Sequence, residues 1–320
     1  MFVSLPIGAF IAAFCVLVPT PWHWRARSVP TLSMIAWLFI GNLTFAINAV
    51  IWVDSVRIVV PVWCDIVTKL QMGATVGLPA ACLCLAIRLE SIASVRNATV
   101  THQMKVRRII FDLCMCWGLP MLYMTLHTVV QGHRFDIVEN FGCRPTIYVS
   151  VVAIFLVFIP PLVLSVGTLG FAGMALVHFF RRRVTFAKHL AQTDSAMTSA
   201  RYFRLMLMAI VEMVFTTVIS SLNVWFTSRD GLRPWLGWDG VHSGFKQIGQ
   251  FPFAFIPTSD RQWTFVLWWS VPVTSYVFFI FFAFGEDAMK EYRKVLPWFR
   301  HRILRRRPSD ANSPYSGYVR

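Results

Sequence analysis

Three ionisable side chains lie inside long apolar stretches, where a charge is costly and usually serves a function. Asp65 and Lys69 are four residues apart, so on a helix they share a face and can form an ion pair. Glu212 lies in a separate apolar stretch. Such residues mark ion pathways, ligand counter-ions or conformational switches. Asp112 stands about one helical turn from Arg108 at the start of another stretch, where a helix N-terminus favours it, and we interpret it as structural.

Four of the seven cysteines suggest metal chemistry at first sight. Cys82, Cys84, Cys114 and Cys116 form two C-x-C pairs, whereas zinc sites typically use C-x-x-C. Two residues apart on a helix, the side chains of each pair point in different directions. We therefore interpret these cysteines as packing residues and expect neither a metal nor a cofactor.

Seven apolar stretches must position these residues. They cover residues 2–20, 31–53, 59–87, 109–130, 146–178, 203–227 and 263–285. A helix rises about 1.5 Å per residue, so roughly 20 apolar residues cross the hydrocarbon core. The alternation of a barrel strand is absent, and only helices or closed barrels satisfy their backbone in lipid. The sequence predicts an all-α bundle of seven transmembrane helices in residues 1–285. Residues 286–320 are expected to be a cytoplasmic basic tail that begins with a short amphipathic helix.

Positive charge is distributed unevenly among the loops. The formal net charge is +15, which alone is typical of nucleic-acid binding, but 22 of the 30 Lys and Arg residues follow stretches one, three, five and seven. Because positive loops stay in the cytoplasm, we expect an extracellular N-terminus and no nucleic-acid partner. Cys64 and Cys143 then share the outer face, where an oxidising compartment reaches them. They either form a disulfide that holds the second outer loop over the bundle or remain two unpaired small apolar side chains.

With this topology, Lys69 and Glu212 lie at matching depths in the membrane. Lys69 is about 15 Å below the outer start of its stretch, and Glu212 is about 13 Å above the inner start of its own. A Lys69–Glu212 contact is therefore allowed, with Asp65 competing for the lysine, and such a pair could act as a switch. The alternative is a solvated polar pocket without this specific contact.

A seven-helix protein belongs to one of few functional classes. A retinal protein needs a lysine in 263–285, and none is present. An intramembrane hydrolase needs converging catalytic groups, but His127 and His178 lie near opposite faces, so we expect no enzyme. A transporter usually shows two related halves, which an odd number of helices without a repeat disfavours. It remains the alternative to a signalling receptor, which the basic inner loops and buried ionisable residues favour.

Five segments carry a family resemblance. They are 61–70 (PVWCDIVTKL), 77–94 (GLPAACLCLAIRLESIAS), 141–145 (FGCRP), 201–204 (RYFR) and 281–286 (FFAFGE). These segments resemble the fungal mating-pheromone receptors of the branch that detects farnesylated, a-factor-like peptides. The Trp-rich segment 235–242 is similar to that of the mushroom and bracket-fungus members, the basidiomycete B mating-type receptors. The landmarks of rhodopsin-like receptors are missing.

This resemblance implies a class D G-protein-coupled receptor in the plasma membrane. It implies a farnesylated peptide pheromone outside and a heterotrimeric G protein inside, and it leaves homodimerisation open. Burying a farnesyl chain gains about 0.8 kcal/mol per carbon, so the ligand needs an apolar slot. The candidate pocket residues are Trp225, Trp235, Trp238, Trp263 and Trp268. An ordinary interfacial aromatic belt is the other interpretation of these tryptophans.

The basic inner segments have two expected partners. The candidate contacts for the G protein are Arg88, Arg181, Arg182, Arg183, Arg201 and Arg204. The arginine cluster of the tail, residues 300–307, is expected to meet anionic membrane lipid.

Overall fold

The computed structural model describes residues 2–94, 101–181, 199–283, 289 and 293, with the backbone only for residues 199–201. Seven helical segments in these ranges are long and apolar enough to cross a membrane, and each overlaps one predicted stretch. They are Ser4–Arg25, Val29–Ile51, Pro61–Ala93, His102–Val130, Val151–Arg181, Tyr202–Ser228 and Thr258–Ala283. The mostly helical fold class is confirmed. The amphipathic helix and basic tail predicted after residue 285 lie outside the described residues, apart from Met289 and Arg293.

The α-helices are α1 (Ser4–Leu17), α2 (Thr20–Arg25), α3 (Val29–Ile51), α4 (Pro61–Ala93), α5 (His102–Leu113), α6 (Leu119–His127), α7 (Val151–Ala153), α8 (Ile159–Arg181), α10 (Ser199–Ser228), α11 (Gly237–His242) and α12 (Thr258–Ala283). The described residues also contain two π-helical turns, η1 (Cys114–Gly118) and η3 (Ile154–Phe158), and two 3-10 turns, η2 (Thr128–Val130) and η4 (Phe253–Phe255). Three short strands, β1 (Phe135–Val138), β2 (Gly142–Arg144) and β3 (Ile248–Phe251), lie outside the bundle.

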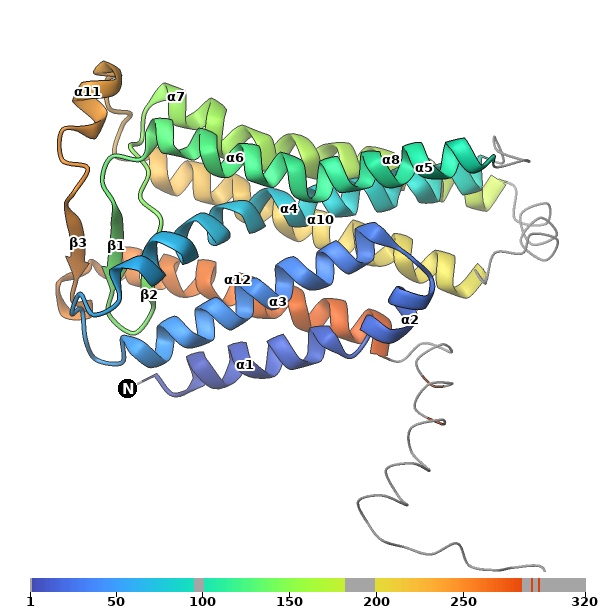
Figure 1. The fold of residues 1–320 in the computed structure, drawn as a ribbon, viewed down its shortest axis with the longest axis horizontal. Helices are drawn as coiled ribbons and strands as arrows, with labels where there is room; N and C mark the ends of the chain where they lie inside the picture. The colour runs from blue at the N-terminus through green and yellow to red at the C-terminus, as the bar shows by residue number, and fades with distance from the viewer. Residues whose placement is uncertain (1, 95–100, 182–198, 284–288, 290–292, 294–320) are drawn as a thin grey trace, which may run out of the picture.

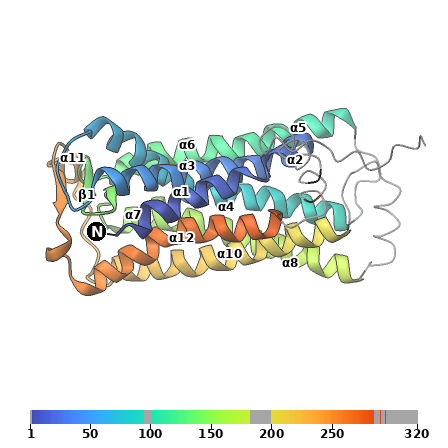
Figure 2. The same cartoon turned by 90° about the horizontal axis from the view of Figure 1, so that it is seen from below.

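The bundle has two different ends (Figure 1). All three strands, α11 and the start of α1 lie at one end, which we call the sheet end. At the other end, the basic end, α4 and α8 finish and α5 and α10 begin. Figure 2 shows α8, α10 and α12 side by side along one flank, in agreement with their packing contacts.

Two prolines leave backbone carbonyls without their helical partner, and side chains from other helices donate to them. Pro120 has no N–H to donate to the Cys116 carbonyl four residues earlier, and the indole Nε1 of Trp37 donates to that carbonyl at 3.0 Å. Pro161 likewise has no N–H to donate to the Val157 carbonyl four residues earlier, and the Tyr123 hydroxyl donates to that carbonyl at 2.8 Å. Both carbonyls lie in the π-helical turns η1 and η3. Side chains thus replace backbone partners inside the membrane, as lipid-embedded polar groups require.

The sheet is the main departure from the all-α expectation. It has the strand order β2-β1-β3, with β1 antiparallel to β2 and parallel to β3. The parallel register pairs Phe135 with Ile248 and Val138 with Phe251. Each strand has three or four residues, too few to show an alternating pattern in the sequence.

Candidate functional site

The loops at the sheet end form a cover over the bundle, which we call the lid (131–150 and 229–257). Strands from both parts of the lid pair in one sheet. Phe135 and Ile137 of β1, within the lid, are fully buried. The Nε2 of Gln250 donates to the Val56 carbonyl at 2.6 Å, which joins the loop between α3 and α4 to the lid. Three loops therefore close this end together.

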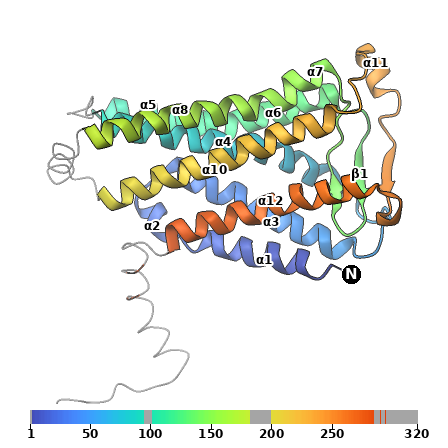
Figure 3. The same ribbon diagram turned by 180° about the vertical axis from the view of Figure 1, so that it is seen from behind.

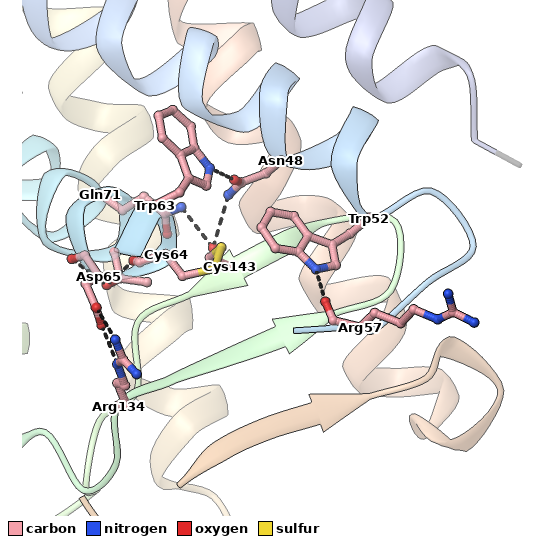
Figure 4. Close-up of a disulfide and its surroundings, with 10 residues drawn as sticks. Asn48, Trp52, Arg57, Trp63, Cys64, Asp65, Gln71, Arg134 and Cys143 are labelled. Carbon is pink, nitrogen blue, oxygen red and sulfur yellow. Dashed lines mark hydrogen bonds and ion pairs between the residues drawn. A yellow bond between two sulfur atoms is a disulfide. The ribbon is translucent and has the colours of Figure 1, made fainter. Parts of the chain in front are cut away.

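A disulfide attaches the lid to α4. Cys64, at the start of α4, is bonded to Cys143 in β2 (Figure 4). The Cys143 carbonyl also accepts from Gln71 Nε2 at 3.0 Å and from Asn48 Nδ2 at 3.4 Å. Trp63 Nε1 donates to Asn48 Oδ1 at 2.8 Å and so orients this amide. The covalent bond and the amide contacts fix β2 over α3 and α4.

Asp65 forms an ion pair with the lid. Arg134 donates from Nε to Asp65 Oδ1 at 2.9 Å and from Nη2 to Oδ2 at 2.5 Å (Figure 4). These hydrogen bonds raise the pKa of the Arg134 guanidinium above its ordinary value. Both side chains are partly exposed, so the pair fixes orientation more than it adds stability.

Lys69 is held by α6 and the residues that follow it. Its ammonium donates to Gln131 Oε1 at 2.7 Å and to the Met124 carbonyl at 3.5 Å. It also lies 3.1 Å from His127 Nδ1, which must accept because an ammonium has no lone pair. The proton of the neutral imidazole then sits on Nε2, which donates to the Thr146 carbonyl at 3.0 Å. The lysine and histidine together connect α4 and α6 to the lid.

The structure contradicts the predicted Lys69–Glu212 contact. All the partners of Lys69 lie on α6 or just after it, and Asp65 binds Arg134 rather than the lysine. Glu212 is buried in α10, and its carboxyl oxygens have no hydrogen-bond partner among the described residues. Thr274 of α12 is the polar side chain beside it, without hydrogen-bonding geometry. The rotation of α4 about its axis turns Lys69 toward α6.

Because Lys69 and Glu212 share no partner, their substitutions should act independently. We expect the effects of Lys69→Gln and Glu212→Gln on the free energy of unfolding to add within about 0.5 kcal/mol in the double variant. Thermal melting of the purified single and double variants measures this sum. A coupling well above that value would show that the two side chains interact after all.

The five candidate tryptophans do not form one site. Trp225 of α10 and Trp263 of α12 line a groove of about 330 Å³ between these helices. Trp235 and Trp238 belong to the lid, where Trp238 stacks on His242 with the ring centroids 4.0 Å apart. Trp268 is only 5% exposed and stacks on Phe45 in the core between α1, α3 and α12. The remaining lining residues of the groove are Leu222, Phe226, Ser259, Gln262 and Val266.

The candidate arginines of the basic end differ in their solvent exposure. Arg181 is exposed at the end of α8, while Arg204 of α10 is half-buried. Arg88 is also half-buried and interacts electrostatically with Asp112, so it is turned toward α5. Arg182, Arg183 and the side chain of Arg201 lie outside the described residues.

Sequence reasoning missed several side chains that connect the elements. Gln131 contacts Lys69, and Arg134 contacts Asp65. Both lie just beyond the end of the fourth apolar stretch, and this position is the only sequence signal that could have indicated these contacts. Tyr202 sits between the arginines of the RYFR segment. Its buried hydroxyl donates to the Leu89 carbonyl at 3.1 Å and connects α10 to α4 at the basic end.

Comparison with known proteins agrees with this architecture. Residues 4–300 match the family described as pheromone A receptor (STE3). The chain is 52% identical over 289 residues to the pheromone B beta 1 receptor of Schizophyllum commune, which covers 90% of this chain and 53% of that protein. It is 30% identical over 303 residues to pheromone receptor 1 of Mycosarcoma maydis, with 93% and 84% covered. It is 25% identical over 299 residues to the pheromone a factor receptor of Saccharomyces cerevisiae, with 92% and 62% covered.

The chain spans about half the length of the Schizophyllum commune relatives that it matches. The matched region includes all seven candidate membrane helices, the disulfide and the lid. On the strength of this match the chain belongs to the pheromone A receptor (STE3) family.

Proposed function

We propose that the chain is a G-protein-coupled receptor that detects a farnesylated peptide pheromone and activates a heterotrimeric G protein. The observation that carries this proposal is the family match over all seven helices. The relatives are named pheromone receptors, and one is named a receptor for a factor. A transporter finds no support in these comparisons.

The proposed orientation places the sheet end outside the cell, in the plasma membrane. The disulfide at that end suits an oxidising compartment. The exposed basic residues at the opposite end, among them Arg27, Lys105 and Arg181, suit the cytoplasmic side. A labelling reagent that cannot cross membranes should therefore modify an introduced cysteine in the lid, and not one beside Arg181, in intact cells.

Reconstitution tests the function directly. The receptor in lipid vesicles should accelerate nucleotide exchange on a fungal Gα subunit when a cognate farnesylated peptide is added, and the unfarnesylated peptide should be much weaker. Absence of exchange with a broad panel of farnesylated peptides, together with solute flux through the vesicles, would favour the transporter instead.

Arginines at the basic end are expected to contact the G protein. Arg181→Glu and Arg204→Glu should each lower ligand-stimulated exchange by at least about tenfold, because a repulsive charge at such an interface weakens binding and each 1.4 kcal/mol of lost binding free energy is about a factor of ten. Peptide binding and surface level should persist. Arg57→Glu, an exposed arginine at the sheet end, is the control for added negative charge. Normal coupling in both basic-end variants would show that these arginines only set topology.

A further inference from the structure

At the sheet end, the described residues of the lid form a hydrogen-bonded cover over the bundle. The lid is tied to α4 by the Cys64–Cys143 disulfide and by the pair of Asp65 with Arg134. It is tied to the loop between α3 and α4 through Gln250. A ligand that carries a long apolar chain would have to displace this hydrogen-bonded cover in order to reach the bundle from water.

The groove between α10 and α12 opens instead on the flank of the bundle. The two helices run side by side, as Figure 3 shows. Trp225 is 63% exposed at the groove, and Leu222 and Val266 are also exposed there, so these walls face outward rather than toward the bundle axis. The rings of Phe226 and Trp263 stack with centroids 5.2 Å apart across the two helices.

Polarity changes along the groove. Ser259 and Gln262 lie in the first turns of α12, at the sheet end, while Val266 is one turn deeper. At the same polar end Arg229 lies over the Phe226 ring at 3.9 Å and binds Asp260 at 2.7 Å. The groove is therefore more polar toward the sheet end and apolar toward the middle of the bundle.

We infer that this groove seats the isoprenoid chain of the pheromone and that the chain reaches it sideways from the bilayer. The inference rests on the proposed function. A prenylated peptide partitions into the membrane surface, with its chain among the lipid tails and its polar part at the interface. The groove presents the same order of surfaces from the sheet end toward the middle of the bundle. Its rigid aromatic walls, Trp225, Phe226 and Trp263, provide broad flat contacts for a branched, unsaturated chain.

Photolabelling of the full chain in phospholipid vesicles tests this inference. The probe is S-farnesylcysteine with a diazirine on the isoprenoid chain. We expect it to label residues 222–226 and 262–266, and excess unlabelled S-farnesylcysteine should displace it. If labelling resists that competitor, or is displaced equally by added phospholipid, the groove holds bilayer lipid only and the inference is overturned.

A groove-filling variant provides the second measurement. Val266→Trp should weaken probe binding by about tenfold, the loss expected when about two carbons of the chain remain outside. Ile280→Trp is the matched control, because Ile280 is 59% exposed on the same helix and does not line the groove. Equal binding by both variants would refute the groove. Exchange stimulated by farnesylated peptides, with labelling elsewhere, would leave the proposed function standing and remove only this inference.

Discussion

Replacement of Cys64 and Cys143 by alanine is expected to lower the free energy of unfolding by about 2–5 kcal/mol, the usual cost of losing a native disulfide. The bond closes a loop between residues 79 positions apart, and it is the covalent attachment of β2 to α4. Without it, α3 and α4 hold the lid only through noncovalent contacts, among them the Gln71 and Asn48 amides and the pair of Asp65 with Arg134. Thermal melting of the purified receptor should show a lower midpoint. Amide hydrogen exchange should rise first in residues 131–150.

Two controls accompany the double alanine variant. Cys114→Ala removes an exposed free thiol and should leave the melting temperature unchanged. A reductant should lower the melting temperature of the original protein but not that of the double alanine variant. An unchanged midpoint in both the variant and the reduced protein would mean that the disulfide does not hold the lid.

The helices could be predicted because their signal is local. Roughly 20 apolar residues in a row meet the length requirement of a bilayer wherever the chain later folds. Topology also singled out Cys64 and Cys143 from the seven cysteines, since both fall at the same predicted membrane face, but it left open whether they pair; the structure has the disulfide. The sheet could not be predicted, because β1 and β3 come from separate loops and their parallel register pairs residues more than a hundred positions apart.

The prediction of site residues was wrong where it depended on which way a side chain points around its helix axis. Five residues turn a helix by about 140°, so Trp263 lines the groove while Trp268 packs into the core. For the same reason, equal depth could not tell which neighbour Lys69 would face. Its acceptors, His127 and Gln131, were visible in the sequence, but the adjacency of α4 and α6 was not.

The close packing of α3 against α4 depends on two glycines. Gly73 and Gly77 are four residues apart, a spacing that predicts close helix approach, and the structure places the indole of Trp37 over both. A Cβ on Gly73 would lie 3.1 Å from the Trp37 ring, and one on Gly77 would overlap its Nε1. The same indole donates to the Cys116 carbonyl and stacks on Trp117 with centroids 5.1 Å apart.

Gly77→Leu should therefore destabilise the protein through two separate effects. Overpacking costs about 1–3 kcal/mol, and the displaced indole leaves the Cys116 carbonyl unpaired for about 1–3 kcal/mol more. Gly170→Leu in α8 is the control, because nothing lies within 4 Å of a Cβ there and both changes gain the same helix propensity. Trp37→Ala alone loses the packing and the hydrogen bond of a buried indole, so Gly77→Leu with Trp37→Ala should lower the melting temperature by less than the sum of the two single changes, because the leucine then fills space that the indole has left. Equal melting of the Gly77→Leu and Gly170→Leu variants would show that α4 can move away from Trp37 at no cost.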